Sequence, residues 1–283
     1  MTNCIINAKN DYDIYKKENI FEAYVDEELV AKGYLYPFFN AVLNPDHPFN
    51  VFIDVACEDF KNNQSVLAQL FETLFTTATE LVQTSGQKRS RIYHSSKVSE
   101  LEKLNWFQQM GLTHNESTFL MMYHLKNTII HQKENSTTKL SFKEIKRSDS
   151  QYIQAFLEGY HQAFSEKKTT EWYLKILQKS NAKAVSAFIN DTMVAGILTY
   201  HLEGAEIGFI EALFVDPHFK SMQIGYRLLN HIHQDFINQG LKIAQLEVWG
   251  PNKHARSFYE KVGYKYVKET AYSVGISITN TSS

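Results

Sequence analysis

The chain has 283 residues, a hydrophobic fraction of 43% and a formal net charge of −2. This length suits one large domain or two ordinary ones, and the near-neutral charge gives no general attraction to nucleic acid or anionic membranes. Only 12 glycines and 5 prolines argue against collagen-like or disordered classes, and two distant cysteines make no disulfide framework.

Residues 23–36, AYVDEELVAKGYLY, predict two strands joined by a two-residue turn at Asp26 and Glu27. Residues 106–112, WFQQMGL, predict the end of a helix, with Gly111 as the residue that terminates it. A polar segment follows, and its Asn, Ser and Thr cluster has no apolar period. We therefore expect a first domain at residues 1–130 and a linker at residues 131–139.

The remaining segment, residues 140–283, alternates strand and helix patterns. The order is one strand, two helices, several strands, a helix, a strand, a short helix and two final strands, and this order indicates an α+β fold. The predicted elements are strands at 140–145, 185–189, 193–200, 208–215, 244–249, 264–268 and 272–278 and helices at 149–164, 170–179, 224–239 and 254–262.

The two halves of the chain look alike. Residues 187–200, AFINDTMVAGILTY, match residues 23–36, and FYEKVGY at 258–264 matches WFQQMGL at 106–112. A weaker match pairs Phe60 and Lys61 with Phe219 and Lys220. Three matches in the same order indicate a duplicated domain. The alternative is two unrelated α/β segments that share hairpin and helix-end chemistry.

Residues 210–229, IEALFVDPHFKSMQIGYRLL, predict a strand, a tight loop and the start of a helix. Pro217 ends the strand because it cannot donate to the ladder, and Gly225 lets backbone approach a ligand closely. A helix N-terminus presents N–H groups and a positive dipole end, so the arrangement favours a phosphate or pyrophosphate. No metal-ligand spacing occurs among the histidines and cysteines, so we expect no metal site.

A second segment places Asn252, Ala255, Phe258-Tyr259 and Gly263-Tyr264 after a strand. With the loop, it resembles the GNAT superfamily of acetyl-CoA-dependent N-acyltransferases. The family loop reads Q/R-x-x-G-x-G/A, so Lys220 and Gln223 depart from it. The resemblance implies two tandem GNAT-like domains, each a mixed, mostly antiparallel sheet flanked by helices, with acetyl-CoA as co-substrate.

The resemblance also implies site residues. Tyr259 would protonate the departing thiolate, and Glu211 would accept a proton from the amine. The alternatives are a core aromatic for Tyr259 and a solvated strand carboxylate for Glu211. The implied cofactor-binding residues are Phe214, Val215, Lys220, Ser221, Met222, Gln223, Ile224, Gly225, Tyr226 and Asn252.

The first half lacks the same chemistry. Its loop, KNNQSV at residues 61–66, contains no glycine, and Phe107 stands where the second half has Tyr259. Glu58 and Asp59 would repel a pyrophosphate. We therefore expect residues 1–130 to be a degenerate GNAT-like copy and residues 140–283 to be the acyltransferase domain.

The resemblance implies an N-acetyltransferase. We expect it to be cytoplasmic, because the sequence shows neither a signal-like start nor an apolar run near the ~20 residues of a membrane span. It would transfer an acetyl group from acetyl-CoA to a primary amine of a small molecule or peptide. The alternative is a non-catalytic module that binds acyl-CoA or a partner protein and acts as a sensor. The sequence does not identify the acceptor or the oligomeric state.

Overall fold

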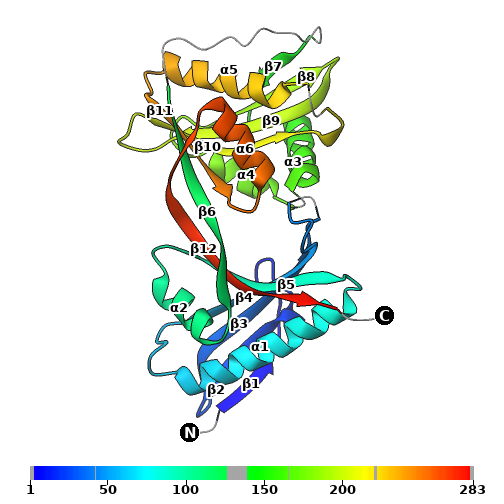
Figure 1. The fold of residues 1–283 in the computed structure, drawn as a ribbon, viewed down its shortest axis with the longest axis vertical. Coiled ribbons are helices and arrows are strands. Elements are labelled where there is room, and N and C mark those ends of the chain that lie inside the picture. The colour runs from blue at the N-terminus through cyan, green and yellow to red at the C-terminus, as the bar shows by residue number, and fades with distance from the viewer. Residues whose placement is uncertain (1–2, 42, 126–138, 165, 220–221, 281–283) are drawn as a thin grey trace. The chain divides into compact units, whose positions relative to one another are not determined.

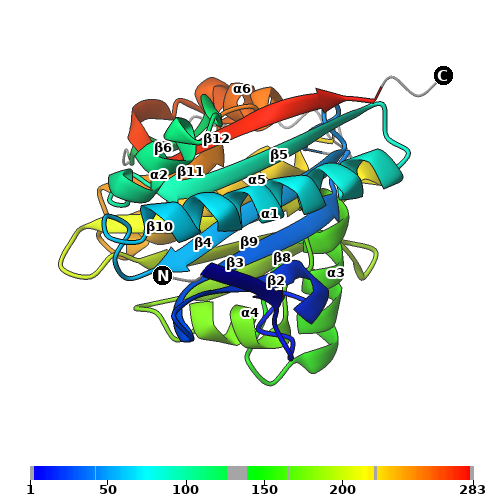
Figure 2. The same ribbon diagram turned by 90° about the horizontal axis from the view of Figure 1, so that it is seen from below.

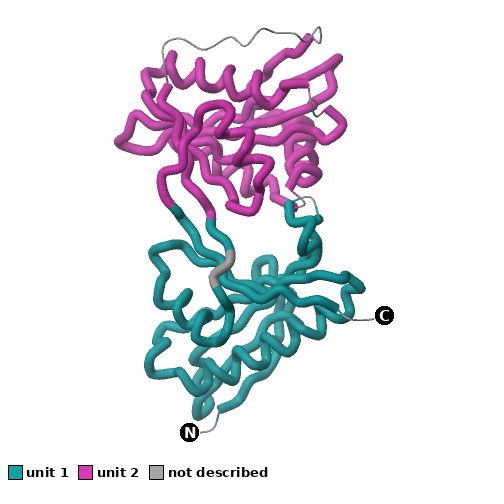
Figure 3. The backbone as a smooth tube through the Cα atoms, in the orientation of Figure 1, with its two compact units in different colours: residues 1–117, 269–283 teal, residues 118–268 magenta. Residues whose placement is uncertain are grey.

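The computed structural model describes residues 3–41, 43–125, 139–164, 166–219 and 222–280. Contacts divide the chain into two units, which Figure 3 shows in two colours. The first unit comprises residues 1–117 and 269–283, and the second comprises residues 118–268.

The first unit is a sheet with helices α1 and α2 packed on one face (Figure 2). Its strand order is β1-β2-β3-β4-β5-β12, with β4 and β5 parallel and the other pairs antiparallel. Apolar residues recur along α1 at Val66, Leu70 and Leu74, and these side chains are buried against the sheet. The elements are β1 Asn3–Asn7, η1 Lys17–Asn19, β2 Ile20–Val25, β3 Glu28–Phe39, β4 Phe49–Cys57, α1 Gln64–Thr84, β5 Arg89–Lys97 and α2 Leu101–Gln109.

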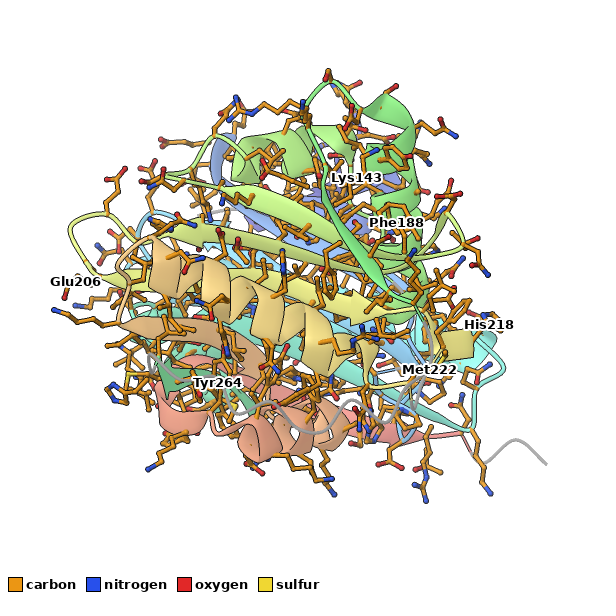
Figure 4. All side chains as sticks on the ribbon, turned by 90° about the horizontal axis from the view of Figure 1, so that it is seen from above. Lys143, Phe188, Glu206, His218, Met222 and Tyr264 are labelled. Carbon is orange, nitrogen blue, oxygen red and sulfur yellow. The ribbon has the colours of Figure 1, made fainter. Side chains whose placement is uncertain are left out.

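The second unit has helices on both faces of its sheet (Figures 1 and 4). Helices α5 and α6 contribute to one core cluster and α3 and α4 to another. The strand order is β6-β11-β10-β9-β8-β7, with β10 and β11 parallel. The elements are β7 Ser141–Glu144, α3 Ser150–Phe164, α4 Thr170–Ile176, β8 Lys183–Ile189, β9 Thr192–His201, β10 Ile207–Val215, η2 Pro217–Phe219, α5 Ile224–Asn238, β11 Ile243–Trp249 and α6 Lys253–Val262.

Two long strands, β6 Thr113–His124 and β12 Lys265–Thr279, run from one unit into the other. Residues 118–124 of β6 pair with β11, and residues 271–279 of β12 pair with β5. Each half of the sequence therefore supplies a strand to the other unit's sheet.

This exchange corrects two expectations. The predicted boundaries placed residues 118–124 in the first domain and residues 269–283 in the second. In the structure, residues 118–124 belong to the second unit and residues 269–283 to the first. The predicted strands at 264–268 and 272–278 are one continuous strand, β12, because its second part continues along β5. The predicted linker at 131–139 lies outside the described residues, apart from Lys139.

Local predictions were more accurate. Both hairpins turn through two residues with positive φ, at Asp26 and Glu27 and at Asn190 and Asp191. That conformation matches the twist of the flanking strands, and short acidic or amide side chains tolerate it. Gly263 ends α6 with φ of 109°. The mixed α+β class, with mostly antiparallel sheets flanked by helices, is confirmed.

Candidate active site

Strands β10 and β11 separate halfway along their length. Their parallel pairing runs from Ile207–Ile243 to Ile210–Leu246, and within the described residues it goes no further. Beyond this point β10 continues to Val215, paired with β9 alone, while β11 continues alongside β6. The edge of β10 that faces β11 therefore opens after Ile210.

Backbone groups of β10 point into this opening. The N–H of Asp216 donates to the Val194 carbonyl of β9, with N and O 2.9 Å apart. Because N–H directions alternate along a strand, the N–H groups of Leu213 and Val215 face the opposite edge, toward the opening.

A β-bulge lies at the point of separation. The register between β9 and β10 shifts between Ile210 and Ala212, which leaves Glu211 as the extra residue. Ile210 packs in the core cluster under α5, whereas Ala212 and Phe214 pack in the cluster with α3 and α4. Alternation along the strand places Glu211 opposite Ile210, on the α3 and α4 face, and the bulge keeps Ala212 on that same face.

Glu211 is surrounded by one cation and two phenols. The Lys179 Nζ lies 3.5 Å from the Glu211 Oε2 and 3.7 Å from the centre of the Tyr200 ring. Burial raises the pKa of Tyr200 and of Tyr160; the charge of Glu211 raises that of Tyr200 further, and Glu166, which accepts the Tyr160 hydroxyl at 3.2 Å, raises that of Tyr160 more than Glu211 does. Both phenols therefore hold their protons at neutral pH, and Tyr200 donates a hydrogen bond to Glu211.

The loop after β10 leads directly into α5, which starts at Ile224 (Figure 4, where Met222 is labelled). The first helical bond of i to i−4 type runs from the Arg227 N–H to the Gln223 carbonyl. The N–H groups of Ile224, Gly225 and Tyr226 precede it, at the positive end of the helix dipole. Lys220 and Ser221 lie outside the described residues.

Gln223 has a left-handed backbone conformation, with φ of 56° and ψ of 18°. Non-glycine residues adopt this region at a cost, which gives a physical reason for glycine at this position in the family pattern. Its side chain makes no capping hydrogen bond to α5 and is exposed.

Gly225 brings three parts of the site together. A Cβ built on it would lie 3.2 Å from the Val215 Cγ2 and 3.6 Å from the Phe258 Cζ. The end of β10, the start of α5 and the middle of α6 are therefore in contact, and a larger residue than glycine would crowd Val215.

Helix α6 holds the other predicted residues. The Asn252 side chain caps it, with its Oδ1 accepting the Ala255 N–H at 3.0 Å. The pantetheine contact expected for Asn252 therefore depends on its Nδ2 group. Tyr259 is the one buried residue of α6, and its ring packs against Phe258 and Tyr264, with centroids 5.2 and 5.6 Å away.

The surroundings of Tyr259 keep its phenol neutral. Burial raises the pKa of Tyr259 well above its ordinary value. The hydroxyl of its neighbour Tyr264 is 2.7 Å from the His233 Nε2, and the His233 ring stacks on Tyr123. Burial lowers the pKa of His233 to about 4, so this neighbouring imidazole is also uncharged near neutral pH.

Two predicted cofactor-binding residues serve packing through their side chains. Phe214 is 4% exposed and lies against Phe156, and added Cβ atoms at Gly159 and Gly196 would overlap its ring. Its N–H faces β9 by the same alternation, so neither the side chain nor the N–H is directed into the opening, contrary to expectation. The Ile224 side chain is buried in the core under α5, which leaves only its backbone for a ligand.

The cluster around Glu211 was missed in part by sequence reasoning. Lys179, Tyr200 and Tyr160 come from three separate elements, and no local spacing connects them to Glu211. Among the described residues, no group of three or more His, Cys, Asp or Glu side chains could hold a metal ion. The described helices likewise include none long and apolar enough to cross a membrane.

Comparison with known proteins finds one family model and several similar proteins. Residues 150–264 match the model of the acetyltransferase (GNAT) family. An uncharacterized N-acetyltransferase of Methanocaldococcus jannaschii is 28% identical over 124 residues, which cover 39% of this chain and 55% of that protein. Another, from Archaeoglobus fulgidus, is 26% identical over 130 residues, covering 41% of this chain and 88% of the relative.

Among solved structures, a probable N-acyltransferase of unknown function from Enterococcus faecalis V583 has a TM-score of 0.56 and 11% identity. The alignment covers 90% of this chain and 61% of that one, and at this identity it shows a shared fold alone. The chain thus spans about half of the first curated relative and less than two thirds of this structural one. Residues 150–264, which contain β10, α5 and α6, are thus similar in sequence to the acetyltransferase (GNAT) family.

Proposed function

We propose that the second unit transfers an acetyl group from acetyl-CoA to a primary amine of a small molecule or peptide. The observation that carries this proposal is the opening between β10 and β11, with backbone N–H groups of Leu213 and Val215 directed into it. An extended pantetheine arm can add to such a strand edge through main-chain hydrogen bonds. The family match of residues 150–264 supports the same reaction.

The start of α5 would hold the pyrophosphate. Its first N–H groups and helix dipole favour an anion, and Gly225 permits close approach of the backbone. Acetyl-CoA, when bound there, supplies the thioester whose acetyl group is transferred. The Val215 N–H would stabilise the negative charge that develops on the carbonyl oxygen.

Glu211 and Tyr259 lie on opposite faces of the sheet, and in this proposal each acts at the opening. Glu211 lies on the α3 and α4 face, and Tyr259 lies in the core with α5 and α6. An amine is protonated near neutral pH and must lose a proton before attack, so the carboxylate serves as the base. The neutral Tyr259 phenol retains its proton for the leaving sulfur.

We further propose that the first unit is a degenerate copy without transfer activity. Its parallel strands β4 and β5 also stop pairing partway, after Phe52 and Tyr93. There the His94 Nδ1 lies 3.0 Å from the Ile53 carbonyl oxygen, and the imidazole stacks on Phe107 with centroids 4.1 Å apart. These buried rings occupy the place where the second unit is open.

The first unit also lacks counterparts of α3 and α4 in its described residues, because between β1 and β2 it has only the short η1. That face of the sheet carries aromatic side chains instead, including Tyr15 against Tyr34 with centroids 4.8 Å apart. A role in packing fits this face better than acetyl transfer. The tandem arrangement, with the first unit as the degenerate copy and the second unit as the transferase, is part of this proposal.

The test combines acetyl-CoA calorimetry with thiol release over a panel of primary amines. Tyr259→Phe should lower kcat by about 10²–10⁴-fold, the usual contribution of a positioned acid. Tyr264→Phe is the matched control, because it removes a neighbouring buried hydroxyl from the same core. Equal kcat for Tyr259→Phe and the parent protein would remove the acid role. Binding of acetyl-CoA without turnover on any amine would favour the sensor, and absence of binding would exclude both functions.

A further inference from the structure

Lys179 presents a primary amine to the carboxylate that we assign as the base. Its Nζ lies 3.5 Å from the Glu211 Oε2 and 3.7 Å from the centre of the Tyr200 ring. A carboxylate and an aromatic face are the two groups that hold an ammonium ion in proteins. The chain therefore fills, with its own side chain, the position that an acceptor amine would take beside Glu211.

This position adjoins the opening in the sheet. Glu211 is the residue at which β10 leaves β11, and Leu213, whose N–H faces the opening, is two residues, or about 7 Å, further along the strand. Lysine carries its amine on a flexible four-carbon chain. The Lys179 side chain is 38% exposed, so it is free to change rotamer.

We propose that Lys179 is a site of self-acetylation, a reaction that rests on the proposed function. The Nζ ammonium gives one proton to the Glu211 carboxylate, and the resulting amine forms a bond to the thioester carbonyl carbon. The carbon–sulfur bond breaks, and the departing thiolate takes the phenol proton of Tyr259. The attacking nitrogen then loses its second proton, which reprotonates the Tyr259 phenolate. The proton on Glu211 passes to solvent.

Acetylation would change the site. It removes the positive charge of Lys179, so the ion pair with Glu211 and the contact with the Tyr200 ring are both lost. The Glu211 carboxylate then has no competing ammonium beside it and can accept a proton from a diffusible amine.

Two other lysines serve as internal controls. The Lys183 Nζ lies 2.9 Å from Asp235 in the second unit, and the Lys103 Nζ lies 3.0 Å from Asp54 in the first. Both pairs resemble Lys179 and Glu211 in being partly exposed ion pairs, but neither carboxylate is at the β10 opening. Direct chemical reaction with acetyl-CoA would modify them as readily as Lys179.

The experiment uses the full chain with acetyl-CoA at neutral pH and follows acetylation of the three lysines by peptide mass spectrometry. Lys179 should be modified at least tenfold faster than Lys103 and Lys183, with a rate constant independent of protein concentration. Glu211→Gln should lower the Lys179 rate at least tenfold, and its unfolding transition reports whether it folds. Lys179→Arg keeps a cation beside Glu211 and cannot be acetylated, so it should lower thiol release with external amines relative to the parent protein.

Two results separate the hypotheses. Acetylation of Lys179 no faster than that of the two control lysines, together with thiol release on the amine panel, would overturn self-acetylation and leave the proposed function standing. Absence of acetyl-CoA binding and of thiol release with every amine would overturn the proposed function itself.

Discussion

Gln223 gives the sharpest test of the phosphate-binding loop, because its backbone is left-handed and its side chain is exposed. A non-glycine residue in this region lowers the stability of the folded state by about 1–2 kcal/mol. Glycine relieves that strain, but its more flexible unfolded chain lowers the free energy of unfolding by about 0.5–1 kcal/mol. Gln223→Gly should therefore raise the free energy of unfolding by roughly 0.5–1 kcal/mol. For a unit of this size, that corresponds to an increase in Tm of about 2 °C.

The matched control is the same substitution within the same helix. Gln234 is exposed in the interior of α5, and its side chain contacts only Asn238 in a bond at the helix surface. Gln234→Gly should lower the free energy of unfolding by about 1 kcal/mol, because glycine is a poor helix former. Urea denaturation of both variants measures the two effects, and they should have opposite signs.

The Gln223→Gly variant also tests whether the loop binds acetyl-CoA. The Gln223 side chain stands where the family pattern has glycine at the phosphate loop, so Gln223→Gly should also lower the Kd for acetyl-CoA in calorimetry. If Gln223→Gly destabilises the protein as much as Gln234→Gly does, the assignment of strain to Gln223 is wrong.

Three further outcomes are expected. Burial lowers the pKa values of His94 and His233 to about 4 from an ordinary 6.5, so as the pH falls these side chains are protonated in the unfolded chain before they are in the folded one. The free energy of unfolding should therefore fall between pH 6.5 and 4, by up to about 3 kcal/mol for each histidine. A urea midpoint that does not change over this range would contradict the prediction. Gly159→Ala should lower the free energy of unfolding by about 1–3 kcal/mol, despite a better helix propensity, because its Cβ would lie 2.4 Å from the Phe214 ring; a stabilised variant in urea denaturation would refute the close contact. Arg substitution of Lys179 should leave the free energy of unfolding within about 0.5 kcal/mol of the parent value in urea denaturation, since a partly exposed ion pair contributes little; a larger loss would give Lys179 a structural role.

Sequence reasoning succeeded where the signal is local. The hairpin turns, the helix end at Gly263 and the end of β10 before Pro217 all depend on the backbone preferences of one or two residues. The Asn252 to Gly263 spacing likewise lies within one short helix and its caps. Such preferences act over a few ångströms, so the residues involved are neighbours in the sequence.

The partners of β6 and β12 could not be predicted in the same way. Both strands have suitable composition for either sheet, and the choice between partners is made by neighbours more than a hundred residues away, such as Tyr93 opposite Gly275. Strand pairing is set by long-range packing rather than by a pattern within the strand. The expected domain boundaries were therefore displaced at both of these strands.

The sequence by itself determined that β10, α5 and α6 follow one another, with motifs that resemble those of the GNAT family. Only the tertiary structure decided which groups face the opening. Alternation after Ile210 places the Glu211 carboxylate beside Lys179, the bulge keeps Ala212 on the same face, and the register of β10 directs the Leu213 and Val215 N–H groups into the opening and turns Phe214 away. Those directions depend on how neighbouring strands pair, and pairing is a property of the folded sheet.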